Sequence, residues 1–175
     1  KGSFLPQVDG ALQCAKPTDI TVSSSSNGYT DSGVVSTVAD LGRYMQAEAA
    51  QALRVKKTPQ RFGSPLPVAD GAPSWYKATG GAYLVGSMIG QHGGTPGYLT
   101  GAYSDPTTGF TVVVVLNDST VGSAFIGDLA FELAAIASKA PAGKGGKAPE
   151  FALPFTAEDY AKAVDSLAVC PLPQG

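Results

Sequence analysis

Three segments of the chain carry apolar residues at the spacing of an amphipathic helix. The first spans about residues 38–54 and the second about 123–138. The third opens at Thr156 and is expected to end by Cys170. The expected apolar stripes are Val38, Leu41, Met45, Ala49, Ala52 and Leu53 in the first helix, and Phe125, Ile126, Leu129, Leu133, Ile136 and Ala137 in the second.

Two of these helices have recognisable start signals. Thr37 is followed three residues later by Asp40, and Thr156 by Asp159, so each pair resembles a capping box. Phe155 and Tyr160 are spaced for a hydrophobic staple across the start of the last helix.

Three extended segments are predicted between the first two helices, at 82–90, 98–103 and 110–116. The link 104–109 contains Pro106 and Gly109, which suit a hairpin turn. The segment 112–116 is apolar at every position, so we expect it to lie centrally in a sheet with both faces covered. Residues 1–33 and 56–81 are predicted to be irregular. The expected fold class is α+β, an antiparallel sheet flanked by helices.

Composition narrows the classes of protein. The 175 residues are 43% hydrophobic and carry a formal net charge of −2, which suits one domain with a real core. Without a basic cluster, a nucleic-acid partner is not expected. No apolar run approaches the roughly 20 residues of a membrane span. We divide the chain into a domain at 1–138 and, at 139–175, a linker with a helical extension; Lys144 and Lys147 in that linker are interpreted as a solvated tether.

The two cysteines, Cys14 and Cys170, lie near opposite ends of the chain. They form either a disulfide or two buried thiols, and we favour the disulfide, which would indicate an exported protein. Neither cysteine has a spacing typical of metal ligands, and the single histidine is far from both in sequence. We therefore expect no metal and no cofactor.

The candidate chemistry lies at residues 91–98, Gln-His-Gly-Gly-Thr-Pro-Gly-Tyr. His92 can donate, accept or carry a proton near neutral pH, and Gly93 and Gly94 would let a ligand approach the backbone. The alternative interpretation is a turn in which His92 is merely exposed or caps a strand.

Two segments together resemble one enzyme family. Residues 33–45, Gly-Val-Val-Ser-Thr-Val-Ala-Asp-Leu-Gly-Arg-Tyr-Met, are similar to the G-G-L-x-S-T-x-x-D-L-x-R-F segment of serine β-lactamase-like proteins. Residues 92–98 resemble the H-x-G-x-x-P-G-[YF] stretch of the same family, and 112–117 its V-V-V-L-T-N strand. The family contains class C β-lactamases, D-alanyl-D-alanine carboxypeptidases and related esterases. The resemblance covers about residues 28–138 and implies the C-terminal part of the β-lactamase/transpeptidase-like fold.

This resemblance implies acyl transfer by a serine of an S-x-x-K helix, assisted by a Y-x-N tyrosine. His92 would hold a substrate carboxylate or support proton transfer, and Thr95 would supply one N–H of the oxyanion hole. Gly93 stands where many relatives have a hydroxyl, and Gly94 would keep the strand open to the substrate. The expected substrate is a small molecule or a peptidoglycan peptide, and the expected location is outside the cell or in the bacterial cell envelope.

The nucleophile and the Y-x-N tyrosine are expected in an N-terminal portion of the same protein, cleaved or split from this chain. The one literal match, Ser74-Trp75-Tyr76-Lys77, lies between Pro73 and two glycines, where a catalytic helix does not fit. Asp40 and Arg43 are interpreted as a helix cap and a solvated side chain. The chain alone is then an inactive part of a serine hydrolase, and its terminal β-strand, 112–116, would be left with an unpaired edge.

Two other interpretations stay open from the sequence. One is a non-catalytic pseudoenzyme or binding module for a cell-wall ligand, which the missing hydroxyl at Gly93 favours. The other is an unrelated α+β domain.

Overall fold

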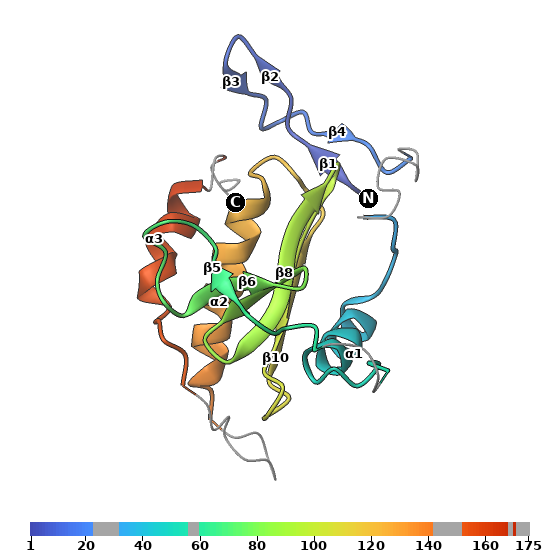
Figure 1. Cartoon of the computed structure of the whole chain (residues 1–175). Helices are drawn as coiled ribbons and strands as arrows, with labels where there is room; N and C mark the ends of the chain where they lie inside the picture. The colour runs from blue at the N-terminus through green and yellow to red at the C-terminus, as the bar shows by residue number, and fades with distance from the viewer. Residues whose placement is uncertain (23–31, 56–59, 142–151, 168–169, 171–175) are drawn as a thin grey trace.

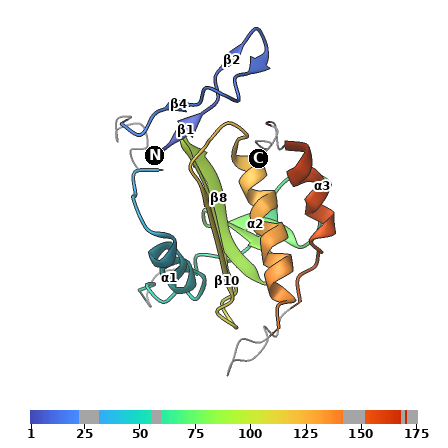
Figure 2. The same ribbon diagram turned by 180° about the vertical axis from the view of Figure 1, so that it is seen from behind.

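A computed structural model describes residues 1–22, 32–55, 60–141, 152–167 and 170. Within them, six strands form one antiparallel sheet in the order β10-β9-β8-β7-β6-β5. Helix α1 covers one face of this sheet, while α2 covers the other and α3 packs on α2 (Figures 1 and 2). The expected α+β class, an antiparallel sheet flanked by helices, is therefore confirmed. Lys144 and Lys147 of the predicted linker lie outside the described residues.

Two-residue turns connect the three strand pairs in the middle of the sheet, whereas longer connections lead from the first strand to the second and from the fifth to the last. The strands are β5 (Leu66–Pro67), β6 (Tyr76–Thr79), β7 (Ala82–Val85), β8 (Met88–Thr95), β9 (Tyr98–Ser104) and β10 (Thr111–Leu116). Gly80 and Gly81 both have positive φ and join β6 to β7, as a two-residue hairpin turn requires. The expectation of irregular structure throughout 56–81 was therefore wrong, because this glycine pair marks a hairpin.

The segment 82–90 was predicted as one strand, and this too was wrong. Gly86, with φ +61°, turns the chain so that β7 and the start of β8 pair, with Val85 opposite Met88. Strand β8 then continues through the glycines to Thr95, where Pro96 and Gly97 turn it into β9.

Strand β10 is an edge strand of the described sheet, paired only with β9 among the described strands. The central position predicted for 112–116 was therefore wrong. Its uniformly apolar sequence has another cause: β10 contacts α1 on one face and α2 on the other. Residues of a strand covered on both faces need not alternate between polar and apolar, wherever in the sheet the strand lies.

Helix α1 spans Val38–Ala49. The Thr37 hydroxyl accepts a hydrogen bond from the Asp40 backbone N–H, so the predicted cap is confirmed. The helix ends earlier than residue 54 because Gln51 adopts a left-handed conformation. Met45 and Ala49 are buried, whereas Val38 and Leu53 of the predicted stripe are exposed.

Helix α2 spans Ser123–Ser138 as predicted, but it buries a different face. Its buried residues are Ile126, Gly127, Ala130, Phe131, Ala134 and Ala135, whereas Leu133 and Ile136 are exposed. Small residues let α2 approach the sheet closely: a Cβ placed on Gly101 would lie 3.2 Å from that of Ala130. The predicted stripe followed the largest side chains and therefore missed this small-residue face.

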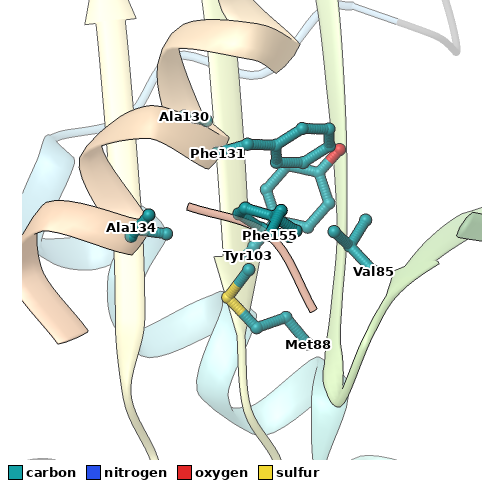
Figure 3. Packing of buried hydrophobic residues seen from close by; sticks show 8 residues of the cluster. Val85, Met88, Tyr103, Ala130, Phe131, Ala134 and Phe155 are labelled. Atoms are coloured by element: carbon teal, nitrogen blue, oxygen red, sulfur yellow. The ribbon is translucent and has the colours of Figure 1, made fainter. Parts of the chain in front are cut away.

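The main core lies between the sheet and α2. Tyr103, Val85 and Met88 contribute from the strands and Phe131 from α2, with Phe155 closing the cluster from the chain leading to α3 (Figure 3). Helix α3 spans Glu158–Leu167. Asp159 accepts hydrogen bonds from the Thr156 N–H and hydroxyl, and the Phe155 and Tyr160 ring centroids lie 5.2 Å apart. The predicted start signals of this helix are thus confirmed, while residues 168–169 lie outside the described part.

The N-terminal residues form an arm rather than a wholly irregular segment. Two-residue strands pair as β1 (Ser3–Phe4) with β4 (Thr18–Asp19), and as β2 (Gln7–Val8) with β3 (Ala11–Leu12). Cys14, just beyond β3, forms a disulfide with Cys170, so the favoured pairing is confirmed. Of the helices in the described residues, none has the length and apolar character needed to cross a bilayer.

Candidate functional site

The predicted site residues lie in the second half of β8, and the strand divides them between two faces. Successive residues of a strand point to opposite sides. His92 pairs with Gly101, whose Cβ position faces Ile126 and Ala130 of α2. Gly93 pairs with Thr100, and both lie on the face that α1 covers further along the sheet. His92 and Gly94 therefore face the α2 side, and Gly93 and Thr95 the α1 side.

The His92 ring is held between aromatic side chains. It stacks on Tyr83 with ring centroids 4.9 Å apart and meets the edge of Phe131 at 6.2 Å. Its Nδ1 atom lies 2.6 Å from the hydroxyl of Tyr103, the tautomer deciding which group donates. The His92 ring fits beneath α2 because residue 127 is a glycine. A Cβ on Gly127 would lie 2.9 Å from Cε1 of His92.

Burial decides the charge of this pair. Loss of water around His92 lowers the pKa of its imidazole, so the neutral ring is favoured at neutral pH. Burial also raises the pKa of the Tyr103 phenol far above its usual range, with Tyr76 and Tyr83 adding to the effect. The two groups thus form a neutral hydrogen-bonded pair.

Gly94 and Thr95 line an open hollow at the end of the sheet, with a volume of about 660 Å³. The N-terminal arm forms one side of it through Phe4, Leu5 and Ile20. The loop before α2 forms another through Ser119, Thr120 and Gly122. Because no side chain among the described residues caps the start of α2, its first N–H groups make this rim electropositive.

The structure brings together only some of the predicted site residues. Gly94 and Thr95 share the 660 Å³ hollow, whereas His92 lines a different one. Gly93 faces open space, since a Cβ at this position would have no neighbour within 4 Å. In this arrangement the side chains of His92 and Thr95 do not line one hollow.

The hollow beside His92 has a volume of about 300 Å³ and is lined mainly by aromatic side chains. It lies between the sheet, α2 and α3, with the lining residues Pro73, Trp75, Tyr76, His92, Ala124, Gly127, Asp128, Phe131 and Tyr160. Sequence analysis missed this group because its members come from four separate segments. The only sequence signal was the concentration of aromatic residues at 75–76 and 155–160.

Residues set aside in the sequence analysis lie outside both hollows. Ser74 is exposed in the turn before β6 and Lys77 lies within β6, so this match is not on a helix. Asp40 accepts hydrogen bonds from Thr37 and Arg43 at the exposed start of α1, as a cap and a solvated side chain would. In the described part of the chain, no three histidine, cysteine or acidic residues gather as a metal site would require.

Comparison with known proteins returned no relative: no protein-family model, no curated protein and no solved structure matches the chain significantly.

Proposed function

We propose that this chain forms one wall of the acyl-transfer pocket of an exported serine hydrolase of the β-lactamase-like type, and that the attacking serine lies in another part of the protein. The substrate would be an amide or ester of the D,D-carboxypeptidase, β-lactamase or esterase class. On its own, the chain would be inactive.

The observation that carries this proposal is the meeting of the two family-like segments. Helix α1 contains most of the first segment, and it packs against β8, β9 and β10. Strand β8 contains most of the second segment, which lies about 50 residues further along the chain. The resemblance implies that these two segments lie close together, and their packing agrees with it.

Two glycines and a backbone N–H of this wall would contact the substrate. Gly93 leaves its face of β8 open, so that a substrate can lie along the strand. Gly94 and Thr95 border the larger hollow, and the resemblance assigns the N–H of Thr95 to the oxyanion. The start of α2 borders the same hollow and would favour negative charge there. A direct role of His92 stays a prediction, which requires that a substrate group reach the α2 face.

The proposed partner is the N-terminal portion of the same protein, carrying Ser-x-x-Lys and Tyr-x-Asn. The outer edge of β10 supports this partner. Ser3 of β1 hydrogen-bonds to the backbone of Asn117 and Ser119 just beyond β10, whereas no described strand other than β9 pairs with β10 itself. A strand from the partner would satisfy the backbone groups along that edge. The disulfide between Cys14 and Cys170 supports an exported protein, in the cell envelope or outside the cell.

Replacing Gly93 by a small and then by a large residue tests whether substrate lies along β8. The experiment uses the protein that contains both this chain and the N-terminal portion. Gly93→Ala should retain most of the acylation rate towards a penicillin or a p-nitrophenyl ester. Gly93→Leu should fill the open face and slow acylation by about 10²-fold, since small misplacements of a substrate have effects of that size. Ala69→Leu, at an exposed loop position, is the control. Wild-type acylation by a folded Gly93→Leu protein would refute the proposal.

A second candidate is a non-catalytic binding module. The separation of His92 from Thr95 favours it, because His92 lines an aromatic hollow other than the one that Gly94 and Thr95 line. This module would keep the fold of the wall without an attacking serine anywhere in the protein. A partner portion that lacks Ser-x-x-Lys would decide for this candidate.

A further inference from the structure

The aromatic hollow beside His92 has the size and depth of a small-ligand site. Its volume of about 300 Å³ is at the lower end of the range for ligand pockets. The turn before β6 provides Trp75, α2 provides Asp128 and Phe131, and α3 provides Tyr160. Four segments of the chain thus converge on a space that none of them fills.

The rings around this space are arranged in a connected set. Phe131 lies at its centre, with ring centroids 5.8 Å from Tyr76 and 5.4 Å from Tyr160, both edge to face. Trp75 stacks beside Tyr76 at 6.0 Å. Aromatic faces carry partial negative charge, so several rings around one space attract a cation that has lost its water.

One carboxylate completes the lining. Asp128 is partly buried, and among the described residues no hydrogen bond or ion pair engages its side chain. Burial raises the pKa of Tyr76 to about 12, with Tyr83 and then Asp128 adding to the effect, and burial followed by the charge of Asp128 raises that of Tyr160. Tyr76 and Tyr160 therefore stay neutral, as does His92. Burial raises the pKa of Asp128 itself above its usual value. No lysine or arginine is among the lining residues, so the ionised carboxylate of Asp128 would be the single charge of the hollow.

We propose that this hollow binds a small organic ammonium ion, methylated or quaternary, with Asp128 as its counter-charge and the aromatic rings around its methyl groups. The site is independent of the proposed acyl-transfer wall. A bare metal ion would need several oxygen ligands, and only one carboxylate is present. Methyl groups on the nitrogen would contact the aromatic rings, which form much of the lining.

The single tryptophan of the chain makes binding directly measurable. Because Trp75 lines the hollow, tetramethylammonium or choline should change its fluorescence in a saturable way. The neutral isostere 3,3-dimethylbutan-1-ol has the shape of choline without the charge. It should bind at least about tenfold more weakly, because it loses both the carboxylate and the cation–π contributions.

Two aspartate variants test whether the carboxylate of Asp128 binds the cation. Asp128→Asn should weaken choline binding about tenfold or more, whereas Asp165→Asn, an exposed acid of α3, should leave it unchanged. Circular dichroism establishes that both variants are folded. Equal binding by Asp128→Asn, equal binding of the neutral isostere, or no saturable response to millimolar cation would each overturn the proposal.

The same ammonium group is part of the headgroup of phosphatidylcholine, so binding to lipid vesicles is measured in a separate experiment. We expect free choline to bind. We expect phosphatidylcholine vesicles to sediment no more of the protein than phosphatidylglycerol vesicles do. Sedimentation with phosphatidylcholine that Asp128→Asn abolishes, without any response to free choline, would overturn the assignment to a small molecule.

Discussion

The imidazole Nδ1 of His92 and the hydroxyl of Tyr103 lie 2.6 Å apart, on neighbouring strands and beneath α2. This contact ties the only histidine of the chain to the main core. The residue with the most obvious chemistry in the sequence is thus also part of the packing between the sheet and α2.

Protonation of His92 should reduce stability as the pH falls. Because burial lowers the pKa of His92 below its usual 6.5, the unfolded chain binds a proton at a higher pH than the folded one does. The free energy of unfolding should therefore decrease as the pH falls from about 7.5 through 6.5 and level off below the folded pKa. Urea unfolding across this range measures the effect. His92→Gln should remove this part of the pH dependence, and an unchanged profile in that variant would contradict the assignment.

Two glycines of β8 should respond oppositely to alanine. A Cβ at Gly90 would overlap the carbonyl oxygen of Ala102 and the ring of Tyr103, whereas one at Gly93 would meet nothing. Gly90→Ala should lower the free energy of unfolding by about 1–3 kcal/mol, as overpacking does. Gly93→Ala should leave it unchanged or raise it by up to about 1 kcal/mol. Equal urea midpoints for the two variants would show that the register of β8 is wrong.

The disulfide should account for a large part of the stability. Cys14 and Cys170 are 156 residues apart in sequence, with Cα atoms 5.8 Å apart. Replacing both by serine should lower the free energy of unfolding by about 2–5 kcal/mol. Reduction of the wild-type protein should have a similar effect on the thermal midpoint, and should not affect the double variant. An unchanged midpoint after reduction would contradict the bond.

The edge of β10 should make the isolated chain self-associate. Val115 of this strand is 41% exposed, beside backbone groups that have no strand partner in the described residues. Size-exclusion chromatography at micromolar concentration should therefore show concentration-dependent association. Val115→Lys should reduce it, because charged residues protect edge strands. Val38→Lys, at an exposed valine of α1, should not. A monomer at all concentrations would argue against a missing strand partner.

Local signals predicted the starts of the helices and the hairpin turn at 104–109 correctly. Thr37 and Thr156 begin helices because their side chains or those of their neighbours satisfy the first N–H groups. The start of α2 was found from periodicity, but its buried face was not. The prediction followed the largest side chains, whereas the close approach of α2 to the sheet depends on Ala130, which faces Gly101, and on Gly127, which faces His92.

Sheet order and the aromatic hollow could not be predicted from sequence. Gly80 and Gly81 were assigned to an irregular segment and Gly86 to the interior of a strand, because β6 and β7 are only four residues long and gave little periodicity. The position of β10 at the edge depends on pairing between strands, which a uniformly apolar segment does not encode. Asp128 became a candidate only when the fold brought it beside Trp75 and Tyr160.

The central claim is that this chain provides a wall of an acyl-transfer pocket but not its nucleophile. Fluorescent penicillin and a fluorophosphonate, followed by peptide mapping, test this claim most directly. The account predicts that the chain alone stays unlabelled and that the protein containing both portions is labelled at a serine outside residues 1–175. Labelling of the chain itself, above all at the exposed Ser74, would contradict the account, and so would the absence of any label on the complete protein.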